Sequence, residues 1–199
     1  MKNCFLLRLS FILLSFACST NLSANSFNLD SLQIQVKCHK LENSVLLRWT
    51  TPNSAIWQTT NSTGFRIERF TIARGDSLLN KPERKLLCDS LQKLPLPAWE
   101  HHVKSNNYAA IVAQALYGDS FTLSTTQSND SSSIPYLVSQ AHEIEQRYLL
   151  SMYAADLDFS VAEMAAWGYT DTTIQANEDY LYRVYCADTT LWNDIHYGI

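Results

Sequence analysis

Strand-like patterning at both ends of the chain encloses a long block of helix-like patterning, and this order constrains the fold more than any other feature. The flanking segments alternate apolar and polar residues, whereas the middle spaces its apolar residues at helical intervals. Any sheet must then be assembled from two separated parts of the chain. We therefore predict a mainly β fold formed by 30–95 and 169–199, with a helical insertion at 96–168.

Three strands are predicted before the insertion. The first alternates over 32–36, the second covers Val45–Thr50, and the third runs from Phe65 to a tight turn. The third strand places Arg69 on the same face as Phe65 and its other apolar residues. Strand patterning returns after the insertion, at 169–174 and again in "EDYLYRVYC".

The insertion is predicted to hold three helices. The first is opened by Pro97 and closed by Gly118, and the second covers 136–157. The third is short, with Ser160 as N-cap, Glu163 completing a capping box, and Gly168 ending it. Between the first two helices, the Ser/Thr/Asn-rich segment 120–134 lacks periodicity, so we expect a flexible surface loop there.

The first 24 residues have the features of a secretory signal. Lys2 and Arg8 precede an apolar run that is too short to span a membrane, and small polar residues follow. Two processing routes remain open, cleavage after Ala24 and lipidation at Cys18. The residues before Cys18 form a poor lipidation motif, so cleavage is favoured, and the mature protein is expected to be secreted or held at the cell surface.

Charge excludes one class of partner. Removing the signal leaves 13 basic and 19 acidic residues, which gives a formal charge of −6. Nucleic-acid binding requires clustered Lys and Arg to neutralise phosphates, and the most basic group, "NKPERKLL", contains Glu83 and is typical of a solvated edge. We expect no nucleic-acid partner and no transmembrane span, although the protein can lie peripheral to the envelope.

Export places the remaining thiols, Cys38, Cys88 and Cys186, in an oxidising compartment. Three is an odd number, so at most one disulfide forms and one thiol is left over. Their spacing does not indicate a zinc site, and we predict no metal or other cofactor.

Three strand motifs resemble the fibronectin type III family. The second strand carries Trp49 and then Pro52, in the place of that family's core tryptophan and proline, and "GFRIER" from Gly64 is similar to its third strand. "IQANEDY" resembles the tyrosine corner, with Ile174 six positions before Tyr180. The resemblance implies a β-sandwich, interrupted here by the helices, whose last strand is incomplete.

The same resemblance assigns the two faces of the tyrosine-rich strand. Tyr180, Tyr182 and Cys186 are expected to face the core, with Cys186 as the leftover thiol, whereas Tyr185 faces outward. Tyr180 is expected to use its hydroxyl to satisfy backbone groups at the corner.

A longer likeness covers "NNYAAIVAQALYGDSF" and "EQRYLLSMYAADLDFSVAEMAAWGYTD". These segments resemble the N-terminal region of large, uncharacterised, fibronectin type III-containing secreted proteins of Bacteroidetes-type bacteria. The likeness implies a bacterial surface scaffold or interaction module, with this chain as the N-terminal part of a larger protein, and it transfers no active site.

Two patterns suggest binding to a host protein or to a glycan. The turn "RGD" at Arg74, Gly75 and Asp76 carries the tripeptide of integrin-binding modules, although this composition also suits a plain tight turn. Exposed aromatic rings can stack on sugars, and the candidate rings are Trp57, Trp99, Trp167, Trp192 and Tyr185. For each of the four tryptophans, a structural role in the core is at least as well supported by the sequence.

No catalytic site is predicted. "HEIEQ" at 142–146 has Gln146 where a zinc protease needs its second histidine, and adjacent His101 and His102 point in different directions. We therefore expect a non-enzymatic protein-binding module, with glycan or host-protein adhesion as the alternative.

Overall fold

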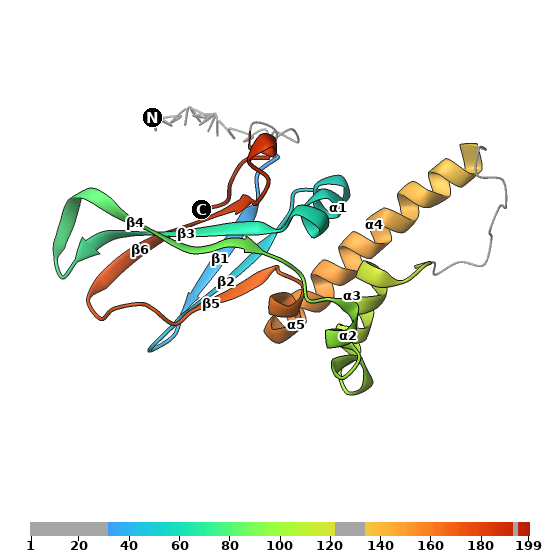
Figure 1. Ribbon diagram of the computed structural model, residues 1–199, viewed down its shortest axis with the longest axis horizontal. Coiled ribbons are helices and arrows are strands. Elements are labelled where there is room, and N and C mark those ends of the chain that lie inside the picture. Colours follow the sequence, from blue (N-terminus) through green and yellow to red (C-terminus); the bar gives the residue numbers. More distant parts are fainter. Residues whose placement is uncertain (1–31, 122–133, 193–194) are drawn as a thin grey trace, which may run out of the picture.

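Two antiparallel three-stranded sheets and a set of helices form the fold (Figure 1). The computed structural model describes residues 32–121, 134–192 and 195–199. The first sheet has the order β1-β2-β5, with bounds Gln35–Lys40, Val45–Thr50 and Gly168–Asp171. The second has the order β4-β3-β6, with bounds Ser77–Leu91, Phe65–Arg74 and Glu178–Cys186.

The two sheets face each other across a hydrophobic core. Every second residue of β2 is buried, and the same holds for Tyr182, Val184 and Cys186 on β6. Trp49 on β2 meets Phe65 on β3 edge to face, with ring centroids 5.4 Å apart. The alternation in the sequence thus decides which face of each strand enters the core.

The helices lie at one end of the sheets, and α4 extends away from them (Figure 1). Among the described residues, one helix connects the two sheets, four helices and a 3-10 turn lie between β4 and β5, and a second 3-10 turn follows β6. Their bounds are α1 Ser54–Thr63, α2 Leu96–Trp99, η1 His102–Lys104, α3 Asn107–Tyr117, α4 Ile134–Leu157, α5 Phe159–Met164 and η2 Thr189–Leu191.

The helices share one core with the sheets. Trp57 on α1 lies 6.3 Å from Trp167 and 6.4 Å from Tyr148 of α4, centroid to centroid. The Tyr148 hydroxyl donates a hydrogen bond of 2.6 Å to the carbonyl of Thr51, directly after β2. Helix α4 is therefore held against α1 by an aromatic contact and against the end of β2 by a hydrogen bond.

Arg147 ties α4 to the end of α3. Its guanidinium donates to the carbonyls of Gln114, Ala115 and Gly118 at 2.8–3.1 Å, and Glu143 pairs with it at 2.7 Å. A cation satisfies unpaired carbonyls there and complements the negative end of the helix dipole.

Several sequence predictions are confirmed. Strand β2 has the predicted bounds, and β3 ends in the predicted turn, where Gly75 has a φ of 56°. A positive φ at the first of two central residues suits a type II′ hairpin turn, which glycine adopts without strain. The predicted faces of β6 are also confirmed, since Tyr182 and Cys186 are buried.

Other predictions are wrong. Helices and strands contribute comparable numbers of residues, so a mainly β fold is too narrow a description and the fold is mixed. Helix α1 and the 15-residue strand β4 were not predicted, and the predicted helix 97–118 is divided into α2, η1 and α3.

The expected cap and end of the last helix in the insertion are wrong as well. Asp158, not Ser160, is the N-cap of α5, because its carboxylate accepts from the N–H groups of Ser160 and Val161. The helix ends at Met164, and Ala166 takes a left-handed φ of 59°, so that Gly168 already begins β5.

Some predictions fall on residues that are not described. They include the signal at 1–24, with Cys18 and Ala24, and most of the loop at 120–134. Beyond β6, two isolated bridges attach residues 195–199, one joining His196 to Gln33 and one joining Gly198 to Val184. An incomplete last strand was predicted after β6, and in the described residues these two bridges occupy that position.

Candidate functional site

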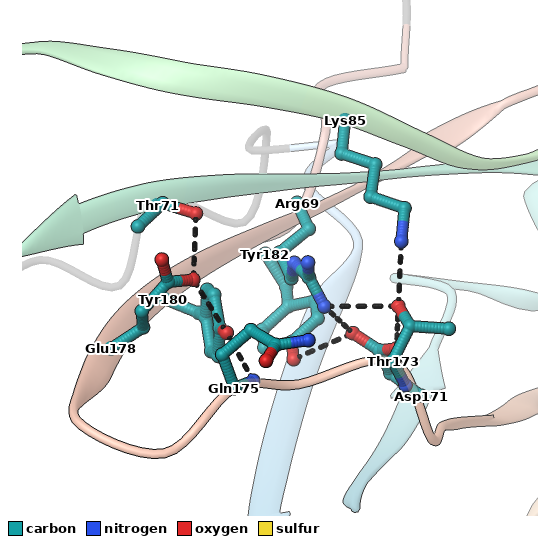
Figure 2. A network of polar contacts seen from close by, with 9 residues as sticks. All are labelled: Arg69, Thr71, Lys85, Asp171, Thr173, Gln175, Glu178, Tyr180 and Tyr182. Atoms are coloured by element: carbon teal, nitrogen blue, oxygen red, sulfur yellow. Dashed lines mark hydrogen bonds and ion pairs between the residues drawn. The ribbon is translucent and has the colours of Figure 1, made fainter. Parts of the chain in front are cut away.

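A buried ion pair joins the two sheets at the end away from the helices. Arg69 on β3 donates to Asp171 at the end of β5 over 2.7 Å, and their side chains are only 6% and 1% exposed (Figure 2). Each residue occupies an inward position of its strand, so the pair spans the space between the sheets. Charges buried to this degree persist only when they are paired and hydrogen-bonded.

The Asp171 carboxylate is fully engaged. The Tyr182 hydroxyl donates to it at 3.0 Å, and the backbone N–H and hydroxyl of Thr173 each donate at 2.8 Å. Burial alone raises the pKa of Asp171, but the donors from Thr173, Arg69 and Tyr182 outweigh burial and hold that pKa below its ordinary value. The carboxylate therefore stays ionised in the folded protein.

Tyr180 continues this network toward solvent. The Gln175 N–H donates to the Tyr180 hydroxyl at 2.6 Å, and that hydroxyl donates to Glu178 at 2.8 Å (Figure 2). The Arg69 guanidinium lies 4.3 Å from the centre of the Tyr180 ring, a cation–π contact. The predicted bond from the Tyr180 hydroxyl to a backbone group of the corner is thus confirmed.

We call the network of Arg69, Asp171, Thr173, Tyr180 and Tyr182 the clamp, because its chemistry suits a structural role. A general base needs a free lone pair within reach of substrate, whereas the Asp171 oxygens already accept from four donors. Burial first, and then the charge of Asp171, raise the pKa of Tyr182, so this phenol stays protonated and keeps donating.

A cavity of about 560 Å³ opens beside the clamp. It lies between β1 of one sheet and β6 of the other, and its lining is mostly apolar. The lining residues are Cys38, Lys40, Val45, Ile72, Ile174, Gln175, Glu178, Asp179, Tyr180, Leu181, Tyr182 and Ile199. Its volume lies within the usual range of ligand pockets.

A group of aromatic side chains lies on the outer side of β6, and we call it the aromatic patch. The Tyr185 ring stacks on Trp192 at 5.0 Å between centroids and lies 5.1 Å from Tyr197. Arg183 covers the Tyr197 ring at 4.8 Å and the Phe70 ring at 4.9 Å. Trp192 is 37% exposed and Tyr197 36% exposed, so the patch faces solvent.

The patch unites two of the aromatic residues that the sequence singled out, Tyr185 and Trp192. The other candidates are core residues, since Trp57 is 4% exposed and Trp99 and Trp167 are fully buried. Of the two readings that the sequence left open for Trp57, an exposed aromatic and a core residue, the structure shows the core residue, because α1 turns this side chain toward α4.

The Arg-Gly-Asp turn lies at the tip of the β3–β4 hairpin, and all three residues are exposed. The Arg74 guanidinium is already held by two carboxylates, from Glu178 at 2.6 Å and from Glu83 at 2.9 Å. An integrin-type ligand presents a free arginine, so the ion pairs weaken this candidate. Asp76 remains accessible.

The histidine motifs lie apart from the clamp. His142 is exposed on α4, Glu143 is paired with Arg147, and His101 and His102 are exposed near η1. In the described part of the chain, no group of three or more His, Cys, Asp or Glu side chains is placed to hold a metal. Cys38, Cys88 and Cys186 are all unpaired, and Cys186 is the buried one.

The sequence analysis predicted neither the clamp nor Tyr197, the third ring of the aromatic patch. One signal was available for the clamp, because the alternation placed Arg69 on the apolar face of its strand, where a charge needs a buried partner. Nothing in the sequence identified Asp171 as that partner or Tyr197 as a neighbour of Tyr185.

Comparisons with protein-family models, with curated proteins and with solved structures gave no match to this chain. Across 32–121, 134–192 and 195–199, no helix combines the length and apolar character needed to cross a membrane.

Proposed function

We propose that this chain is a secreted or cell-surface interaction module of fibronectin type III-like fold, and that it binds a protein partner through the aromatic patch. The observation that carries the proposal is the stacking of Tyr185, Trp192 and Tyr197 on one solvent-facing surface. Export rests on the predicted signal at 1–24. No enzymatic role is proposed, because the Asp171 carboxylate already accepts from four donors and offers no free lone pair to a substrate.

Strand order supports the fold assignment. In immunoglobulin-type sandwiches, strands A, B and E share one sheet, and C and F share the other with a C′ strand beside C where it is present. The orders β1-β2-β5 and β4-β3-β6 correspond to this arrangement, with β4 as C′. The fully buried Trp49 and the Tyr180 corner bond add the two most specific motifs of the resemblance.

The composition of the patch favours a protein partner. Tyrosine, tryptophan and arginine are the residues that most often dominate binding energy at protein interfaces. Arg183 is already held over Tyr197, so little side-chain entropy is lost when a partner covers it. A sugar platform needs an open ring face, whereas Tyr185 has Trp192 and Tyr197 against it.

The test compares wild-type protein with Trp192→Ala and with Tyr153→Ala, an exposed tyrosine of α4 outside the patch. Each is incubated with separated envelope and secreted proteins of the source organism and, in parallel, with a glycan array, and contacts are mapped by cross-linking. We expect a protein whose cross-links surround Trp192 and whose binding falls about tenfold or more in Trp192→Ala but not in Tyr153→Ala. Glycan binding lost in Trp192→Ala, or a partner that contacts other faces, would overturn the proposal.

A further inference from the structure

We propose that the protein partner of the aromatic patch presents an acidic segment, and that the carboxylates of this segment bind an arginine cluster on the same face of the sheet. The cluster consists of Arg66 on β3, Arg84 on β4 and Arg183 on β6, arranged around Glu68. This inference rests on the proposed function, because it assigns a chemistry to the partner that the patch binds.

The arginine cluster lies on the outer face of the second sheet. Glu68 stands directly opposite Arg183 in the pairing of β3 with β6, so the two side chains share a face. Arg183 lies between Tyr182 and Val184, whose side chains are buried in the core, so its own side chain points outward. Arg66 is two residues from Glu68 on β3 and therefore lies on this face as well.

Glu68 supplies a fixed counter-charge under the arginines. Its carboxylate accepts from the Arg66 Nε at 2.9 Å and from Arg84, and its side chain is only 4% exposed. Burial raises the pKa of Glu68, but the hydrogen bonds from Arg84 and Arg66 outweigh burial and hold this pKa below its ordinary value. The ionised carboxylate thus orders two guanidinium groups before any partner arrives, which lowers the entropy lost on binding.

The acids of this face do not balance its arginines. The exposed Asp89 pairs with Arg66 at 2.8 Å, so three cations and two anions leave one net positive charge on the cluster. The chain as a whole carries a formal charge of −4, so the charge of the cluster is opposite to that of the molecule. A partner with carboxylates over the cluster is electrostatically complementary, whereas a basic partner is repelled.

Arg84 offers the donors that a carboxylate needs. Its side chain is 52% exposed, and among the described residues its hydrogen bond goes to Glu68. A guanidinium carries five N–H donors in a planar fork that matches a carboxylate, so most of the Arg84 donors remain for a partner. Arg66 is less available, because its side chain is 20% exposed and is divided between Glu68 and Asp89.

The arginine cluster and the aromatic patch form one continuous surface. Arg84 stands opposite Phe70 in the pairing of β4 with β3, and Arg183 lies 4.9 Å from the Phe70 ring and 4.8 Å from the Tyr197 ring. Because β3 lies between them, Arg84 and Arg183 are separated by two strand spacings, about 10 Å. One small anion does not span that distance, whereas about three extended residues of a peptide do.

The experiment selects ligands for the full chain from a library of random peptides of about ten residues displayed on phage. We expect the selected peptides to carry Asp or Glu within about three residues of an apolar side chain. The tightest peptide is then compared, by fluorescence anisotropy, with a copy in which Asn and Gln replace every Asp and Glu. The amide copy should bind wild-type protein about tenfold or more weakly, and this comparison needs no variant that might fail to fold.

Two matched variants test the arginine. Arg84→Gln removes the exposed guanidinium, whereas Lys104→Gln removes an exposed charge of η1, outside this face. We expect Arg84→Gln to weaken the acidic peptide about tenfold or more and Lys104→Gln to leave its affinity within about twofold.

Trp192→Ala separates this inference from the proposed function. If it weakens the acidic peptide and Arg84→Gln does not, the partner binds the patch alone, and the inference fails while the proposed function stands. If only Arg84→Gln weakens the peptide, the cluster binds acidic segments without the patch and the proposed function fails.

Four other results would overturn the inference. They are a selection that yields no binding peptide, equal affinities of the acidic peptide and its amide copy, binding of an acidic polysaccharide that Arg84→Gln abolishes, and a dimer in sedimentation equilibrium that Arg84→Gln makes monomeric. In the last case the occupant would be a second copy of this chain.

Discussion

The buried ion pair predicts that either single replacement harms the protein and that the two together largely repair it. Asp171→Asn keeps the shape of the side chain and still accepts from Thr173, but it leaves the Arg69 guanidinium buried without a counter-charge. It also turns an amide N–H₂ toward two donors, Arg69 and Tyr182. Breaking a buried pair in this way costs about 3–5 kcal/mol.

Arg69→Met should cost a similar amount, because it leaves the Asp171 carboxylate charged at 1% exposure. In the double variant both positions are neutral. The amide oxygen introduced at position 171 accepts from Thr173, and the amide nitrogen donates to the Tyr182 oxygen. We therefore expect the double variant to be about 3 kcal/mol or more stable than the sum of the single effects predicts.

Urea unfolding followed by tryptophan fluorescence measures these differences, because Trp49, Trp99 and Trp167 are fully buried and report loss of the core. A cost of 3–5 kcal/mol corresponds to a fall in Tm of roughly 6–20 °C for a chain of this size. Single effects below about 1 kcal/mol, or a double variant that equals the sum of the singles, would mean that water screens the pair and that the clamp is not closed.

The pH dependence of stability gives a second test of the ion pair between Arg69 and Asp171. The folded pKa of Asp171 is depressed, so the carboxylate contributes its full stability above the unfolded pKa of about 3.9 and loses it as pH falls through the lower folded value. The stability difference between wild type and Asp171→Asn should be constant from pH 7 to about 5 and should narrow below about pH 4. A difference that narrows near neutral pH would contradict the assignment.

Single contacts elsewhere in the molecule give three further predictions. Tyr180→Phe should destabilise by about 1 kcal/mol or more through loss of the bond from the Gln175 N–H, and an unchanged Tm would remove the corner assignment. Arg147→Met should destabilise by about 1–3 kcal/mol and raise hydrogen exchange at the end of α3 selectively, whereas uniform exchange would argue against a capping role. In the native protein a thiol reagent should label Cys38 readily and Cys186 only on unfolding, and equal rates would contradict the burial of Cys186.

The sequence predicted β2, β3 and β6, which each bury one face, and missed β4 and α1, which bury few or no side chains. Alternation locates β2, β3 and β6 because a buried face demands an apolar residue at every second position. Strand β4 lies at a sheet edge with every residue exposed or half-exposed, so it carries no such alternation. Helix α1 buries only Trp57 and Thr60 and is rich in Thr and Ser, which have modest helix propensity.

The sites were harder to predict because their parts come from distant positions. Arg69 and Asp171 are 102 residues apart, with all of α2 to α5 between them. Tyr185 could be placed on the outer face of β6 from its position alone. Its contact with Tyr197 depends on the path of the chain after η2, for which no local pattern exists in the sequence.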